Sequence, residues 1–238
     1  MSASIHKKLR SFKLSQMDLE RSLWDMANLF RAPRRVYRSI NLRVKTINQY
    51  GREDLSFIIL FSTLIIFTSF CWALFFENSL KGYISLLCSM LFVDFLAVGF
   101  ILSSIYYFVA KRFLLKDIYR ESASIGSFQN QLEWKYCFDI HCNSFFPVFV
   151  LLYIIQLILL PIISGSNFIS LFLGNSLYLV ALCYYTYLTF IGYQTLPFLK
   201  DTHTLLIPIP MFLIMWALSL LGYNVPQHII SVYFRNDA

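Results

Sequence analysis

The sequence predicts an all-α polytopic membrane protein, a helix bundle with five transmembrane helices and an N-terminal cytosolic pair of amphipathic helices. Hydrophobic residues make up 58% of the 238 residues and charged residues only 14%, a composition far from that of a typical soluble domain. Several uncharged apolar runs reach the roughly 20 residues that a helix needs to cross the hydrocarbon core. Both observations place most of this chain in a lipid bilayer.

We expect three parts along the chain. Residues 1–54 form a basic cytosolic arm, residues 55–223 form the five-span bundle with a cytosolic loop at about 111–142, and residues 224–238 form a short lumenal tail. The first 52 residues carry twelve Lys and Arg against three acids, a net charge of +9. An arm of this kind can bind nucleic acid, but next to a membrane segment it more often contacts anionic lipid or acidic protein.

Two amphipathic helices are predicted in the arm. Ser15 and Asp18 match a capping box, and an apolar stripe follows at helical spacing: Leu19, Leu23, Met26 and Phe30. Pro33 is typical of the first position of a second helix, whose apolar stripe is Val36, Ile40, Val44 and Ile47. Two arrangements stay open: the helices lie on the cytosolic leaflet, or they pack on the bundle or on each other.

The exposed side of the arm is the predicted docking surface for a partner or for the membrane. It combines apolar and aromatic side chains with a cluster of arginines that falls within two helical turns. Its residues are Leu19, Trp24, Phe30, Arg31, Arg34, Arg35, Tyr37 and Arg38.

Five apolar runs follow the arm, and each is predicted to be one span. They cover residues 55–76, 82–110, 143–163, 168–199 and 204–223. No cleavable signal peptide is visible, so we expect the first run to be an uncleaved anchor. The fourth run would be about 48 Å long as one straight helix, so we expect it to tilt, protrude or break near Gly174, Gly192 or Pro197.

The distribution of Lys and Arg predicts the orientation. Eighteen of them fall in the arm, the central loop and Lys200, whereas only Lys81 and Arg235 fall on the opposite side. Cytosolic loops carry the excess of Lys and Arg in membrane proteins. We therefore expect a cytosolic N-terminus and a lumenal C-terminus.

Asp94 is an acidic residue near the middle of the second span. A carboxylate at this depth costs on the order of 3 kcal/mol, so we expect it to face the bundle interior or to be protonated. One hypothesis is a proton or ion site. The other is a structural hydrogen bond to a polar residue on a neighbouring helix, such as Asn143, Asn175 or Gln156.

Asp139, His141 and Asn143 stand at the start of the third span, before Pro147. On a helix, Asp139 and Asn143 share one face, and Pro147 leaves the carbonyl of Asn143 without its helical partner. We interpret the group as a polar hinge at the membrane border, where Asp139 and His141 need not be buried. Together with Asp94 and Asn175 they are the predicted polar site of the bundle.

Two catalytic alternatives exist for the same segment. Cys137, Asp139, His141 and Cys142 could bind zinc, or Cys137 and His141 could act as nucleophile and base in acyl transfer. The chain has neither an HExxH motif nor paired CxxC motifs, and no orienting element for a nucleophile is visible. We therefore expect no catalytic residue, no metal site and no cofactor.

Several short motifs, each weak alone, occur in the order found in one known family. They are Gln16–Asp18, Trp24, Leu29-Phe30, Pro33, Arg35–Tyr37, Glu133-Trp134, Asp139–Asn143, Phe146-Pro147, Gly174-Asn175, Thr189–Tyr193 and Leu196–Leu199. From about Leu14 to Tyr233 the chain resembles the Unc-fifty (uncoordinated-fifty) family. The chain departs from that pattern at Arg52–Leu55, where a proline is expected after the acidic pair; we expect this to affect only the start of the first span.

The resemblance implies a Golgi membrane protein that acts in vesicle-mediated transport and in delivery of surface membrane proteins. It also implies association with large guanine-nucleotide exchange factors for Arf GTPases, and it implies no catalytic residues. With the basic arm, this favours a scaffold that recruits Arf exchange factors and contacts membrane lipids, with membrane-protein cargo as a further partner and no nucleic acid. The alternatives are an intramembrane lipid-modifying or ion-conducting activity at the polar site, and a cargo chaperone that uses the tyrosine-rich fourth span.

Overall fold

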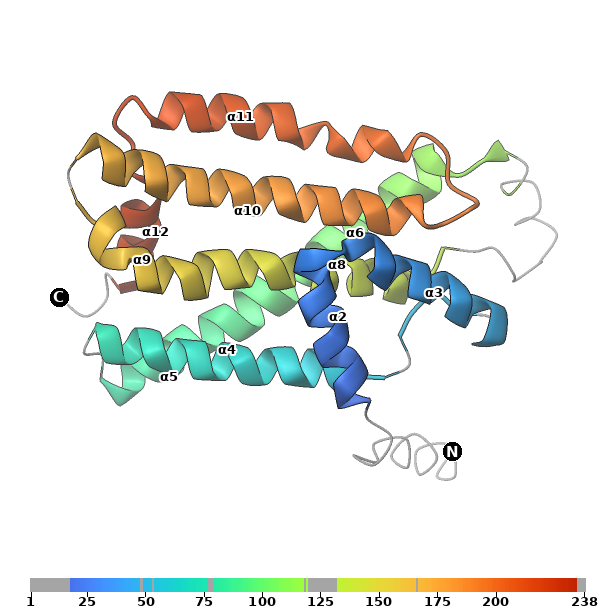
Figure 1. The fold of residues 1–238 in the computed structure, drawn as a ribbon, viewed down its shortest axis with the longest axis horizontal. Helices are drawn as coiled ribbons and strands as arrows, with labels where there is room; N and C mark the ends of the chain where they lie inside the picture. The colour runs from blue at the N-terminus through green and yellow to red at the C-terminus, as the bar shows by residue number, and fades with distance from the viewer. Residues whose placement is uncertain are drawn as a thin grey trace.

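The computed structural model describes residues 18–47, 49–52, 54–76, 79–117, 119, 132–165 and 167–234. These residues are almost entirely helical, and no β-strand occurs among them beyond one isolated bridge between Leu115 and Leu199. Five helical stretches are long and apolar enough to cross a membrane, and most of them run lengthwise through the bundle (Figure 1): Ser56–Phe75, Leu80–Leu114, Trp134–Ile163, Phe168–Gln194 and Thr202–Ser219. The predicted all-α five-span bundle is confirmed.

Two helices precede the first span. Helix α2 covers Leu19–Arg31, and helix α3 covers Pro33–Ile47 and begins at the predicted proline. The Asp18 carboxylate caps α2 by accepting a hydrogen bond from the Arg21 amide at 3.0 Å, which satisfies one of the free amides of a helix start. Ser15, the predicted cap, lies outside the described residues.

Both arm helices pack on the bundle, and α2 crosses it at an angle in Figure 1. Their buried apolar side chains face α4 (Ser56–Phe75), α8 (Trp134–Phe149) and α10 (Phe168–Gln194), and they include Met26, Leu29, Val36, Tyr37 and Ile40. The Tyr184 hydroxyl of α10 also donates to the carbonyl of Leu29 at 2.7 Å. Of the two arrangements left open by the sequence, the structure has the packed one.

The second span contains two π-helical segments, and the third span contains one. The second span consists of α5 (Leu80–Cys88), η2 (Ser89–Ala97), α6 (Val98–Val109) and η3 (Ala110–Leu114). The third consists of α8, η5 (Val150–Ile155) and α9 (Gln156–Ile163). Segments of this kind inside α-helices are frequent at functional sites. Here η2 carries Asp94 and η5 carries Tyr153.

The third helix begins at Trp134, nine residues before the predicted start at Asn143. This first part of α8 reads as a polar loop, but its side chains are bonded inside the bundle. The Trp134 indole donates to the Ser104 hydroxyl at 3.1 Å, and the Tyr136 hydroxyl donates to the carbonyl of Gly192 at 2.9 Å. The polar and aromatic side chains in this part of the chain therefore bond to neighbouring spans and do not indicate a loop.

The fourth span ends earlier than its apolar run. Helix α10 stops at Gln194, before Pro197, and continues without a break through Gly174 and Gly192. A Cβ at Gly192 would lie 2.9 Å from Cγ1 of Ile140, so this glycine permits a close approach between α10 and α8. The chain then turns through η6 (Thr202–Leu206) into α11 (Pro208–Ser219).

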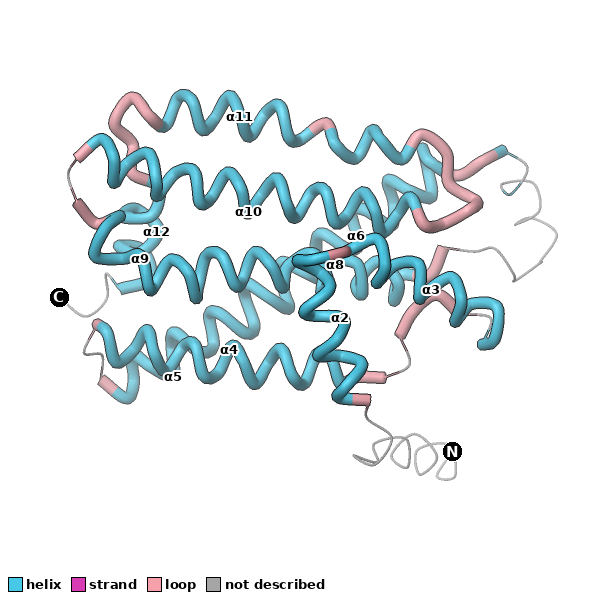
Figure 2. Tube along the Cα trace, viewed as in Figure 1, coloured by secondary structure: helices cyan, strands magenta, loops and turns pink. Residues whose placement is uncertain are grey.

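Residues expected to form a short tail contain a further helix, α12 (Val225–Phe234). Figure 2 shows it at the end of the bundle away from α3. The Phe234 ring stacks on Phe76 with centroids 4.0 Å apart and on Trp72 at 5.9 Å. Helix α12 therefore folds back onto the bundle, because its apolar side chains find an aromatic surface there.

Candidate functional site

Arg52, in the linker before the first span, is buried and joins the arm to the bundle. Only 8% of its surface is exposed. Its Nη2 donates to Oδ2 of Asp25 on α2 at 3.2 Å and to Oδ1 of Asn143 on α8 at 2.6 Å. The guanidinium also lies over the Phe57 ring, 4.3 Å from its centre. A buried charge needs both an opposite charge and hydrogen bonds, and α2 and α8 supply them together.

The backbone around Arg52 is held by carboxylates of the third span. The Arg52 amide donates to Oδ2 of Asp139 at 2.6 Å, and the amides of Tyr50 and Gly51 donate to the two oxygens of Glu133 at 3.4 and 3.2 Å. Three successive linker amides thus meet two carboxylates. We call Asp25, Arg52, Asp139 and Asn143 the arginine network.

The network explains the polar residues at the start of the third span. Asp139 and Asn143 bind one residue, Arg52, from one helix face, as their spacing predicts. The prediction that Asp139 and His141 need not be buried is wrong, since only 6% and 2% of their surfaces are exposed. Asp139 is buried because the linker at Arg52 covers it, and His141 is buried because α8 packs against η2, α6 and α10.

His141 lies outside the arginine network, on another side of α8. Its Nδ1 lies 3.0 Å from the Tyr185 hydroxyl and its Nε2 lies 3.3 Å from the carbonyl oxygen of Phe95. Gly99 makes room for the ring, because a Cβ there would be 2.6 Å from Cδ2 of His141. Both ring nitrogens are therefore engaged with groups other than Cys137, which disfavours the acyl-transfer hypothesis.

No group of three His, Cys, Asp or Glu side chains is arranged to hold a metal ion within the described ranges. Cys137 and Cys142 are buried in α8 as free thiols. The zinc hypothesis gains no support from this geometry.

Asp94 is bonded to two tyrosines. The hydroxyl of Tyr153 on η5 donates to its Oδ2 at 2.8 Å, and the hydroxyl of Tyr233 on α12 donates to the same oxygen at 2.5 Å. The structural hypothesis foresaw a hydrogen bond to a neighbouring helix, but its named candidates Asn143, Asn175 and Gln156 were not the partners. Phenols carry their donor at the end of an apolar ring, so this bond places little polar surface in the bundle.

Asn175 holds the connection between α11 and α12. Its Nδ2 donates to the Ser219 hydroxyl and to the carbonyl of Tyr223, both at 2.9 Å, and its Oδ1 accepts from the Val225 amide at 3.0 Å. The side chain is 2% exposed. One buried amide therefore fixes the path of the chain into α12.

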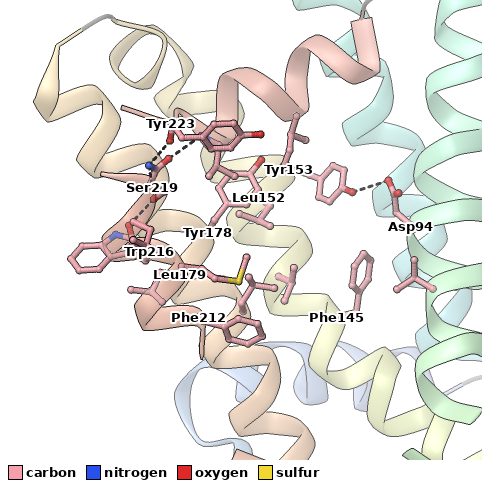
Figure 3. Close-up of a pocket in the computed structure, with 18 residues that line it drawn as sticks. Asp94, Phe145, Leu152, Tyr153, Tyr178, Leu179, Phe212, Trp216, Ser219 and Tyr223 are labelled. Atoms are coloured by element: carbon pink, nitrogen blue, oxygen red, sulfur yellow. Dashed lines mark hydrogen bonds between the residues drawn. The ribbon is translucent and has the colours of Figure 1, made fainter. Parts of the chain in front are cut away.

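A cavity of about 920 Å³ lies between these two polar clusters (Figure 3). Asp94 and Tyr153 stand at one wall, and Ser219 and Tyr223 stand at the other. Asn175 also lines the cavity and bonds to Ser219 and Tyr223. Most of the remaining lining is apolar. The five residues of the predicted polar site thus fall into separate places: Asp94 and Asn175 line the cavity, Asp139 and Asn143 belong to the arginine network, and His141 is bonded to Tyr185.

The predicted docking surface is largely exposed. The exposed fractions of Leu19, Trp24 and Phe30 are 48%, 45% and 41%, and four arginines are exposed beside them: Arg31, Arg34, Arg35 and Arg38. Tyr37 is an exception, because only 1% of its surface is exposed and burial raises the pKa of its phenol. Tyr37 is a core residue next to Asn143 and does not belong to the docking surface.

Sequence reasoning missed Arg52, Tyr153 and Tyr233. Arg52 was counted in the basic charge of the arm and in the departure from the family pattern at Arg52–Leu55, but no bond to the bundle was assigned to it. Its position next to the first apolar run was the one available signal. Nothing in the sequence distinguishes Tyr153 and Tyr233 from the other tyrosines of this chain.

Asp54 gives the arm a dependence on pH. Burial acts to raise its pKa, but hydrogen bonds from the hydroxyl and amide of Ser56 and from the Asp18 amide outweigh burial, so the pKa is lowered. A lowered folded-state pKa stabilises the fold above the unfolded value and loses this contribution as pH falls through the folded value. Below about pH 4 we expect faster hydrogen exchange at the start of α2. The Asp54→Asn variant should lack this change, and an equal change in that variant would argue against Asp54 as its source.

The chain matches the model of the UNC-50 family over residues 8–234. It is 66% identical to the Protein GMH1 homolog of Schizosaccharomyces pombe over all of both chains. It is 36% identical to the Protein unc-50 homolog of Dictyostelium discoideum, covering 98% of this chain and 90% of that one, and 36% identical to the human Protein unc-50 homolog, covering 94% and 84%. No solved structure matches. The resemblance noted in the sequence is thereby confirmed, and the chain belongs to the UNC-50 family of multi-pass membrane proteins.

Proposed function

We propose that this protein is a non-enzymatic scaffold of the Golgi membrane that acts in vesicle-mediated transport and in delivery of surface membrane proteins. Its N-terminus is cytosolic and its C-terminus lumenal. In this proposal α2 and α3 recruit large Arf guanine-nucleotide exchange factors from the cytosol. The resemblance to the family implies the Golgi location and the kind of partner, and the excess of Lys and Arg around the arm supports the orientation.

One observation supports the recruiting role above others. The arginine network fixes α2 to the bundle through Arg52. The arm is therefore a folded surface held on the membrane bundle and not a flexible segment. On that surface Arg31, Arg34, Arg35 and Arg38 point away from the buried stripe. Arginine forms paired hydrogen bonds with carboxylates, so an acidic protein surface is the partner that this patch fits.

Replacement of the four arginines by alanine tests the proposal. Each cation near a charged surface contributes on the order of 1 kcal/mol, so we expect binding of a purified Arf exchange factor to fall by at least about tenfold. The measurement uses the full chain in bilayer discs made only of phosphatidylcholine, so that attraction to anionic lipid does not contribute.

A variant with lysine at the same four positions is the matched control, because it keeps the charge and loses the planar guanidinium. Intermediate binding by this variant indicates that both charge and geometry contribute. Full binding by the alanine variant, with normal insertion, would exclude the arm as the docking surface.

A further inference from the structure

The cavity between the second, third, fourth and fifth spans is independent of the recruiting surface. Its lining comes from η2, α6, α8, η5, α10, α11 and α12. Helix α11 packs chiefly against α10, so it does not close the bundle toward α6. The cavity is therefore a space within the membrane part of the protein, bounded by helices far apart in the sequence.

The mouth of the cavity faces the bilayer. Val98 on α6 and Met215 on α11 both line the cavity, and 38% and 65% of their surfaces are exposed. Leu182 on α10 and Leu218 on α11 also line the cavity and are exposed. Exposed apolar side chains within spans contact lipid, so the cavity opens sideways to the hydrocarbon core.

Water is a poor occupant for this space. A buried water needs two to four polar partners, and Oδ2 of Asp94 and both ends of the Asn175 amide already have partners in the protein. The walls between them consist of side chains such as Phe145, Leu152 and Leu179. The chemistry of the lining fits a hydrocarbon occupant.

The volume of the cavity is large enough for a lipid chain but too small for a membrane-spanning helix. An α-helix about 10 Å across that rises 1.5 Å per residue occupies on the order of 120 Å³ per residue. The cavity of about 920 Å³ would therefore hold only about eight residues, whereas a span needs about 20. It lies within the range of about 300–1,000 Å³ of sites that hold small ligands.

We infer that this cavity is a binding site for a hydrocarbon chain of a bilayer lipid, which enters sideways between α6 and α11 and is covered at one end by α12. Val225 and Ile229 of α12 line the cavity. The bond from Tyr233 to Asp94 and the bonds of Asn175 hold α12 in this position. The π-helical segments η2 and η5 carry Asp94 and Tyr153, whose side chains face each other in Figure 3.

A photoactivatable lipid tests the inference. The full chain is placed in phosphatidylcholine discs that contain phosphatidylcholine with a diazirine on one acyl chain, and labelled residues are mapped by mass spectrometry after irradiation. We expect label on Phe145, Leu152 and Leu179 of the cavity wall in addition to the outer surface. Label confined to outward residues such as Phe67 and Phe100 would overturn the inference.

A variant with Leu152→Trp and Leu179→Trp fills the cavity. Loss of the contacts of about two methylene groups lowers occupancy about tenfold, so label on Phe145 should fall by about that factor. Leu173→Trp is the matched control, because Leu173 is on α10 but is exposed and does not line the cavity.

Unchanged label on Phe145 in the filled variant would overturn the inference, as would an equal fall in the Leu173→Trp control. A second measurement does not depend on whether the filled variant folds. Delipidated wild-type protein in detergent should show a higher unfolding temperature on addition of lysophosphatidylcholine, a lipid with one chain, and no shift with glycerophosphocholine, its head group alone. Absence of a shift with the single-chain lipid contradicts the proposal.

Discussion

Replacing Arg52 by methionine is expected to destabilise the protein by about 3–5 kcal/mol, the cost of breaking a buried ion pair by removing one partner. Methionine keeps an unbranched apolar side chain in place of the arginine stem, but Asp25 and the amide of Asn143 lose the guanidinium that they bind at 3.2 and 2.6 Å. The contact with the Phe57 ring at 4.3 Å loses its cation. Unfolding in mixed micelles with increasing sodium dodecyl sulfate measures the change.

Two further variants show whether the loss comes from the network. Arg34→Met removes an arginine from the exposed surface of α3 and should change stability by less than about 0.5 kcal/mol. Arg52→Met combined with Asp25→Leu removes both charges and should recover part of the loss, since a buried pair can be replaced by apolar groups at little cost. Equal stability of the Arg52→Met variant and the wild type would contradict the role given to this residue.

The Arg52→Met variant also distinguishes the packing of the arm on the bundle from the binding of a partner. Arg52 is buried and does not belong to the exposed patch, so its loss acts on partner binding only through the position of α2. We expect proteolysis to cut α2 faster in Arg52→Met, whereas the variant with four alanines should keep wild-type resistance. The proposed function gives the two sets of arginines distinct roles, and this comparison tests them.

The five spans could be predicted because their signal is one of length. A run of uncharged residues long enough to cross the membrane needs no knowledge of its neighbours, and Pro33 marked a helix start from local geometry alone. The start of α8 at Trp134 could not be predicted in this way. A polar residue such as Asp139 lowers the local hydrophobicity, so this segment is not predicted to be part of a span. The group that satisfies its carboxylate is the amide of Arg52, 87 positions away in the sequence.

The candidate sites show the same limit. The spacing of Asp139 and Asn143 predicted one shared face, and Arg52 binds both of them. Tyr37 was predicted to be a docking residue as an aromatic side chain beside the arginine cluster, yet the helix turns it into the core. The return of α12 depends on an aromatic surface built by Trp72 and Phe76, which exists only after the bundle has formed.

Asn175→Leu is expected to release α12 from the bundle. Leucine has a similar volume, but the Tyr223 carbonyl and the Val225 amide lose their partners at 2.9 and 3.0 Å. Each buried polar group left unsatisfied costs about 1–3 kcal/mol, so we expect a loss of roughly 2–4 kcal/mol, concentrated at this end of the bundle. Hydrogen exchange of the amides in α12 should rise by a factor of at least about ten.

Asn167→Leu is the matched control for this variant. Asn167 precedes α10, is exposed and makes no side-chain hydrogen bond to the helix start, so its replacement should leave exchange in α12 unchanged. Unaltered protection of α12 in Asn175→Leu would show that the aromatic stack of Phe234 on Phe76 holds the helix without help.

A double-mutant cycle shows whether the two polar clusters act together on α12. Tyr233→Phe removes only the hydroxyl that binds Asp94 at 2.5 Å and, like Asn175→Leu, should raise hydrogen exchange in α12. If α12 leaves the bundle as one unit, the second substitution adds less than the first, because the helix is already displaced. Additive effects would mean that each end of α12 opens separately. The cavity would then be covered by two independent contacts and not by one helix that moves as a whole.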